Sequence, residues 1–145
     1  MTFQVFVGYG DRQAMLVAEG FGRYLLRFGL NSFVASTNPI WMLPGYTISR
    51  IYKMLARSDV LVATCTRNTL PTSNLGREIR FAQAHKMLVL PFLEKGITDP
   101  FGLSRGIWKM EFDPTMPWVQ HRTFATYILS LMEKSLEARL QGQLI

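Results

Sequence analysis

One glutamate in this sequence has the clearest chemical potential, because neither routine structural role of a helix acid accounts for it. Glu78 lies in the stretch 72–79, which follows an apolar strand and has the pattern of the opening turns of a helix. If Ser73 caps that helix, a capping box would need its acid at position 76, which is glycine. An ion pair along the helix would need Lys or Arg at position 81 or 82, and those residues are Phe81 and Ala82.

A carboxylate at the rim of an apolar crevice can stabilise a developing cation, hold a ribose hydroxyl or guide a water molecule. Ribosyl transfer passes through an oxocarbenium-like state of that kind. Glu78 sits three residues after Leu75 and one before Ile79, on the margin of the helix face that should pack on a sheet. The structural alternatives are a solvated helix charge and a partner from elsewhere in the chain.

Other chemistries find less support. The segment beginning Gly8-Tyr9-Gly10 has the start of a dinucleotide fingerprint, but Gln13 stands where the third glycine belongs. A phosphoreceiver domain would need an acidic pair after the first strand, and Asp11 is alone. The two histidines suggest no catalytic triad, and no ligand spacing typical of a metal site is present, so we expect no metal and no cofactor.

Composition predicts a single globular domain over residues 1–145, since 48% of the residues are hydrophobic and 18% are charged. The longest apolar run, 87–93, falls far short of the ~18 residues of a membrane helix, so we expect no membrane partner. The N-terminus lacks the pattern of a signal peptide, and Cys65 is the only cysteine, which excludes an internal disulfide. A cytoplasmic location is the simplest expectation.

The net charge of +6 comes from sixteen scattered Lys and Arg residues. No basic run typical of a nucleic-acid surface appears, so we expect no nucleic-acid partner. The alternatives are a solvated basic surface and a pocket for phosphates.

Strands alternate with helices along the chain, which predicts a parallel sheet with right-handed crossovers. Expected strands cover 2–9, 31–35, 59–64, 87–93 and 107–112, and expected helices cover 13–28, 48–55, the Glu78 segment up to about 85–86, and 119–140. A flavodoxin-like order of five strands with helices on both faces follows. In such a sheet, ligands bind outside the carboxyl ends of the first and third strands, where Tyr9 to Arg12, the loop after the second strand, Cys65 to Asn68 and the start of the Glu78 helix should meet.

The loop 36–46 carries an unusual load of apolar residues, among them Trp41, Met42 and Leu43. Loops are normally polar, so these side chains need a partner. They either fold back over the core of the domain or contact another subunit or a ligand.

Five pieces of the sequence, in the right order over positions 3 to 112, resemble the Toll/interleukin-1 receptor (TIR) domain family. They are Val5 to Asp11, Pro44-Gly45 followed by Ile48, Ser58 to Ala63, Thr72 or Ser73 to Glu78, and Val89-Leu90-Pro91. The resemblance implies a flavodoxin-like fold. It also implies the activity of the enzymatic branch of the family, which cleaves the nicotinamide–ribose bond of NAD+ by hydrolysis or cyclisation. The likeness is to the prokaryotic branch, which acts in anti-phage immune signalling.

The catalytic glutamate of the family falls on Glu78. The turn after the first strand falls on Tyr9 to Arg12; it includes Gly10, and in it Tyr9 would stack on a ring and Arg12 would hold a phosphate. NAD+ would be the substrate, without a further cofactor. Many members carry a tryptophan, which stacks on a ring of NAD+, where this chain has Asn74. We consider Trp41 as the residue that takes over this stacking. Cys65 either lines the pocket or is a small buried residue at a strand end.

The family's assembly loop falls on residues 36–46, with Trp41-Met42-Leu43-Pro44-Gly45 at its centre. The resemblance therefore implies self-association through this loop, and an effector protein as a further partner. One alternative function is a non-enzymatic TIR adaptor, which would assemble and tolerate loss of Glu78. Another is an enzyme similar to nucleoside 2-deoxyribosyltransferases, which would leave NAD+ untouched.

Overall fold

The computed structural model of the chain describes residues 3–35, 46–104 and 110–144. Five parallel strands form one sheet in the order β2-β1-β3-β4-β5. The strands are β1 (Gln4–Tyr9), β2 (Asn31–Val34), β3 (Val60–Cys65), β4 (Leu88–Glu94) and β5 (Met110–Phe112). The helices are α1 (Arg12–Phe28), α2 (Tyr46–Ala56), α3 (Asn74–Ala84), the short 3₁₀ helix η2 (Pro117–Gln120) and α4 (His121–Leu144). The predicted α/β architecture with a flavodoxin-like strand order is confirmed.

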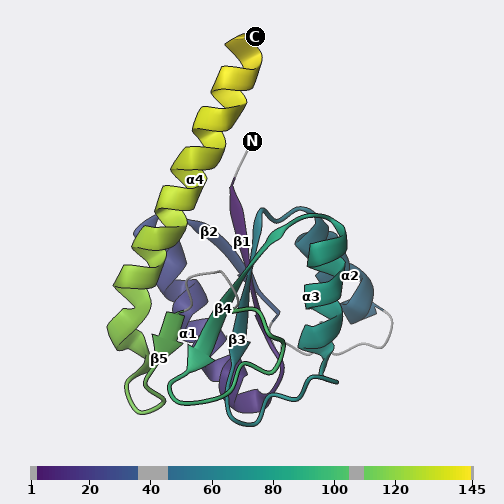
Figure 1. Cartoon of the computed structure of the whole chain (residues 1–145), viewed down its shortest axis with the longest axis vertical. Coiled ribbons are helices and arrows are strands. Elements are labelled where there is room, and N and C mark those ends of the chain that lie inside the picture. Colours follow the sequence, from purple (N-terminus) through teal and green to yellow (C-terminus); the bar gives the residue numbers. More distant parts are fainter. Residues whose placement is uncertain (1–2, 36–45, 105–109, 145) are drawn as a thin grey trace.

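The middle of the sheet is apolar on both faces because helices cover both. Every residue of β3 is buried, and β4 is buried from Val89 to Glu94, as the continuous apolar runs in the sequence predict. Helices α1 and α4 lie on one side of the sheet, and α2 and α3 lie on the other (Figure 1). Each side has its own hydrophobic core, with Val7 and Phe92 in the first and Phe6 and Leu93 in the second.

Helix α1 is delimited by residues whose side chains or backbone satisfy its free ends. Asp11 caps its start, where the carboxylate accepts a 2.9 Å hydrogen bond from the backbone N–H of Ala14. Gly29 ends it in the left-handed conformation (φ 99°), and its N–H bonds to carbonyls of the last turn. The helix therefore begins directly after β1, which places its first turn at the switch point of the sheet.

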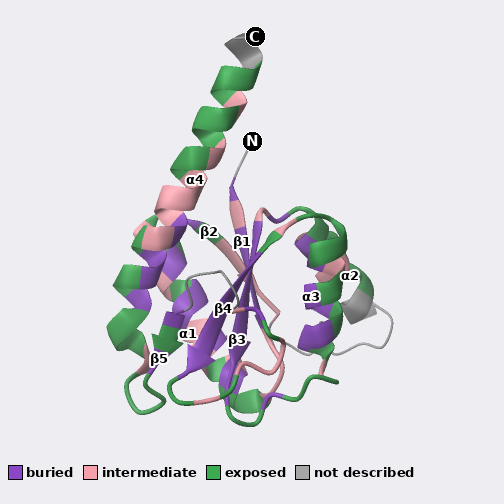
Figure 2. Cartoon of the chain, in the orientation of Figure 1, coloured by how far each residue is buried: buried purple, intermediate pink, exposed green. Residues whose placement is uncertain are grey.

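Helix α4 packs on the sheet only along its first half. Phe124, Ala125 and Ile128 are buried, whereas residues 133–142 are exposed or half-exposed, and the helix projects beyond the sheet (Figure 2). An ion pair of 3.2 Å between Arg139 and Asp59 ties this second half to the domain.

The last part of the chain differs in detail from the expected elements. The strand expected at 107–112 is described as Met110–Phe112, and residues 107–109 lie outside the described residues. Val119, the expected start of the last helix, lies in η2, so α4 begins at His121 and runs further, to Leu144. Within the described part of the chain, no helix has the length and apolar character needed to cross a membrane.

Candidate functional site

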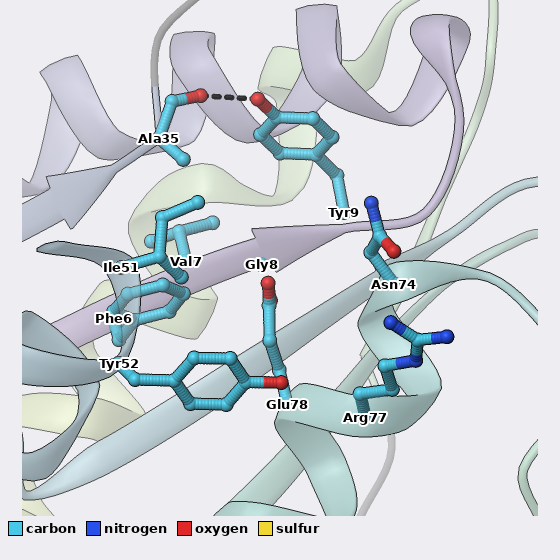
Figure 3. A pocket seen from close by; sticks show the side chains of 10 residues that line it. All are labelled: Phe6, Val7, Gly8, Tyr9, Ala35, Ile51, Tyr52, Asn74, Arg77 and Glu78. Atoms are coloured by element: carbon cyan, nitrogen blue, oxygen red, sulfur yellow. Dashed lines mark hydrogen bonds between the residues drawn. The ribbon is translucent and has the colours of Figure 1, made fainter. Parts of the chain in front are cut away.

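A cavity of about 160 Å³ opens at the carboxyl end of β1, near the switch point between β1 and β3. We call it the switch-point cavity. Its described walls come from β1, the end of β2, α2 and α3: Phe6, Val7, Gly8, Tyr9, Ala35, Ile51, Tyr52, Asn74, Arg77 and Glu78 (Figure 3). The only acid among these residues is Glu78, and the only base is Arg77.

Glu78 lies on the buried face of α3, together with Leu75, Ile79 and Ala82. Its side chain is 8% exposed and points from α3 toward β1 (Figure 3). Among the described residues, none forms a hydrogen bond with its buried Oε1 atom. Burial raises the pKa of this carboxyl to about 8, which favours its protonated form at neutral pH. A buried carboxyl without a partner is costly for a purely structural residue, and is typical of a functional one.

The approach of Glu78 to the sheet depends on a glycine in β1. A Cβ atom added to Gly8 would lie 2.9 Å from Oε1 of Glu78 and 2.9 Å from Cδ1 of Leu75. Side chains do not tolerate contacts that short. Gly8 therefore provides the space in which the carboxyl of Glu78 lies.

We expect Gly8→Ala to displace Glu78 and to lower the free energy of unfolding by about 1–3 kcal/mol, because the added methyl group overpacks this contact. Chemical denaturation measures the effect. Gly142→Ala in α4 is the matched control: no atom lies within 4 Å of a Cβ there, so the higher helix propensity of alanine should leave stability equal or slightly higher. Equal stability of Gly8→Ala and the parent would contradict the close approach.

Two tyrosine rings lie on opposite sides of the Glu78 carboxyl (Figure 3). Tyr9, at the end of β1, donates a hydrogen bond from its hydroxyl to the carbonyl of Ala35, which links β1 to the residue after β2. Burial, and then the charges of Glu78 and Glu19, raise the pKa of Tyr9 to about 12, so it stays neutral. Tyr52, from α2, packs its ring on Phe81 of α3 with centroids 5.1 Å apart. The cavity therefore offers a ligand two aromatic walls.

A second hollow of about 440 Å³, which we call the outer cavity, adjoins the first and shares Tyr9 and Asn74 with it. Its other described walls are Gly10, Asp11, Arg12 and Met15. Arg12 is exposed, at the first turn of α1, where the helix dipole also favours an anion. Arg12 and the helix end could therefore attract a phosphate, whereas the carboxylate of Asp11 in the same wall opposes one.

Asp11 organises the loop on the far side of the outer cavity. Its Oδ2 atom accepts hydrogen bonds from the hydroxyls of Thr66, at 3.0 Å, and Thr69. Gly10 fits closely beside this loop, because a Cβ there would lie 2.7 Å from Oγ of Ser73. The single aspartate of the first turn is thus a positioning residue: it holds α1 and the loop between β3 and α3 in register.

The structure brings together most of the predicted site residues. Glu78, Tyr9 and Asn74 line the switch-point cavity, and Gly10 and Arg12 line the outer one. The prediction that Cys65 lines the pocket is wrong. This residue is fully buried in the core between the sheet and α3, and burial raises the pKa of its thiol far above the usual range. It lines neither cavity, so its alternative interpretation as a small buried residue holds. Trp41 and the loop residues Met42, Leu43, Pro44 and Gly45 lie outside the described residues.

Among the lining residues of the switch-point cavity that sequence reasoning missed, two have polar side chains, Arg77 and Tyr52. Arg77 is exposed and adjoins Glu78 in the sequence. Its charge beside that acid is the signal that could have identified it as a site residue. Tyr52 has the spacing of a core residue of α2, and no sequence signal separates a tyrosine that packs in a core from one that also borders a cavity.

Fold and site together define an α/β protein of flavodoxin-like topology with a buried carboxyl in a cavity at its switch point. No protein-family model matches the chain, and a comparison with curated proteins finds no match.

Proposed function

We propose that this protein is a TIR-type enzyme that cleaves the nicotinamide–ribose bond of NAD+, by hydrolysis or by cyclisation of the ADP-ribosyl group, in anti-phage immune signalling. The observation that carries the proposal is the carboxyl of Glu78, which is buried at the switch point and has no hydrogen-bond partner among the described residues. The resemblance of the sequence to the TIR family supports the same reaction.

The sizes of the two cavities suit the ends of a dinucleotide. A cavity of about 150 Å³ can hold a benzene-sized ring. The switch-point cavity, at about 160 Å³, therefore has room for one ring of a ligand, such as the nicotinamide or its ribose. The remainder of NAD+ would extend through the outer cavity of about 440 Å³, where Arg12 can pair with a phosphate.

Glu78 supplies the charge that the reaction needs. The nicotinamide ring of NAD+ is cationic, so its arrival beside the protonated carboxyl favours loss of the Glu78 proton to solvent. When the C1′–N bond breaks, its electron pair leaves with nicotinamide and positive charge develops on the ribose. The resulting carboxylate stabilises that charge in a site with little water. Attack on C1′ by water gives ADP-ribose and a proton. Attack by a nucleophilic group elsewhere in the same ADP-ribosyl group gives a cyclic product, one water lighter, and a proton.

Incubation of the concentrated protein with NAD+, with the products resolved by mass spectrometry, tests the proposal. We expect release of nicotinamide together with ADP-ribose, or with a product one water lighter, and the mass of that product distinguishes hydrolysis from cyclisation. High protein concentration favours the self-association through residues 36–46 that belongs to the proposal. Intact NAD+ in a self-associated sample would favour the adaptor, and nucleoside exchange without NAD+ cleavage would favour the transferase.

A further inference from the structure

A third cavity, of about 320 Å³, lies between α1 on one side and η2 with the first residue of α4 on the other. It is on the α1 and α4 side of the sheet, as the packing of His121 against Phe21 and Phe92 indicates (Figure 1). It shares no described lining residue with the switch-point cavity. We call it the α1–η2 cavity, and the proposed NAD+ chemistry makes no use of it.

The charged side chains among the described lining residues of the α1–η2 cavity are both positive. Arg23 and Arg27 lie one turn apart on α1, both are exposed, and neither forms an ion pair with any described residue. The charge of Arg27 also reaches His121 on the opposite wall: burial, and then this charge, lower the pKa of that imidazole to about 4. Two like charges at this spacing slightly destabilise a helix, so an anion that binds both would relieve a repulsion.

The other walls of the α1–η2 cavity are aromatic. Trp118 of η2 is 61% exposed, and Tyr24 of α1 is half-buried beside His121, with ring centroids 5.6 Å apart. An indole with this exposure is an unusual surface residue, and aromatic side chains of this kind serve as contact surfaces for rings.

We propose that the α1–η2 cavity binds a small aromatic anion, whose ring lies against Trp118 and whose phosphate or carboxylate pairs with Arg23 and Arg27. Ligand pockets usually measure about 300–1,000 Å³. At about 320 Å³ the cavity suits one or two fused rings with a single anionic group.

Titration with 1-naphthyl phosphate, followed by NMR of the imidazole resonances, tests the proposal. The two histidines of the chain provide a signal and an internal reference. His121 lines the cavity, whereas His85 lies at the end of α3, where it stacks on Phe81. We expect the His121 resonances to shift and its pKa to rise from about 4, because a bound anion favours the imidazolium form, while His85 stays unchanged.

Half-ligands and variants complete the test. We expect inorganic phosphate and 1-naphthol each to bind at least about tenfold more weakly than 1-naphthyl phosphate, since each lacks one of the two contacts. Arg27→Gln and Trp118→Ala should each weaken 1-naphthyl phosphate by about tenfold. Arg122→Gln is the matched control, because this exposed arginine of α4 is absent from the lining, and should leave the affinity unchanged.

Three results would overturn the proposal: equal shifts of His85 and His121, unchanged affinity in Arg27→Gln, or phosphate that binds as tightly as 1-naphthyl phosphate. If a variant melts at a much lower temperature than the parent, the half-ligand comparison on the parent protein decides. The proposal does not depend on NAD+ cleavage, so either can fail alone.

Discussion

Glu78→Gln is expected to lower NAD+ cleavage by about 1,000-fold, because glutamine keeps the shape of the side chain and removes the charge that stabilises the ribosyl cation. The rate of nicotinamide release per protein measures the effect. Glutamine fits a site in which the carboxyl is normally protonated, so the variant should fold as well as the parent. The loss is therefore expected in kcat, with no loss of folded protein.

Two further variants delimit the role of this carboxyl. Glu78→Asp keeps the carboxylate but shortens the side chain by one methylene, which moves the charge away from the ligand. This variant should retain more activity than Glu78→Gln and less than the parent. Glu133→Gln removes an exposed carboxylate from α4, and should leave the rate unchanged. If Glu78→Gln cleaved NAD+ at the parental rate, Glu78 would have no part in catalysis.

The stability of the parent is expected to fall by about 2 kcal/mol between pH 6.5 and pH 8.5, and Glu78→Gln should abolish this fall. The pKa of Glu78 is about 8 in the folded protein, against an ordinary value of 4.5. The unfolded chain therefore loses this proton at lower pH than the folded one. Between these two pKa values the folded state holds a proton that the unfolded state has released, so the free energy of unfolding decreases as pH rises.

The comparison with Glu78→Gln isolates Glu78 from the other groups with shifted pKa values, because those groups titrate alike in both proteins. The pKa of His121 is lowered from 6.5 to about 4, so the unfolded chain binds this proton at higher pH than the folded protein. The free energy of unfolding therefore decreases as pH falls from about 6.5 to about 4. The pKa values of Cys65 and Tyr9 are raised from 9.0 and 10.0, so they act only at higher pH. Denaturant titration at several pH values measures the slope. Parallel slopes for the parent and Glu78→Gln would show that the carboxyl is not buried in solution.

The parts of the fold that depend on local pattern could be predicted from the sequence. The apolar runs of β3 and β4 are buried on both faces, and Met110 and Phe112 alternate with exposed Glu111 as an edge strand requires. The sequence indicates Glu78 because no residue at helical spacing from it could pair with it, and it places the side chain at the margin of the packed helix face. In the structure the residue is buried on that face of α3.

Contacts between distant segments could not be predicted in the same way. Gly8 needs to be a glycine because α3 crosses β1 at that residue, and this crossing joins segments that are far apart in the sequence. Cys65 and Tyr9 both end strands at the same edge of the sheet, yet one side chain points into the core beneath α3 and the other borders a cavity. His121 falls in the first turn of the expected helix 119–140, but its burial depends on α1 and β4, which lie far from it in the chain.

The projecting second half of α4 affects how unfolding must be followed. Its residues 133–142 bury little surface, so their helical structure depends mainly on intrinsic propensity and on the Arg139–Asp59 pair. Such a segment frays at lower denaturant concentration than the sheet, and far-ultraviolet ellipticity would then combine two transitions into one broad curve. A probe in the sheet, such as the slow amide exchange of β3, reports the cooperative loss of the domain alone.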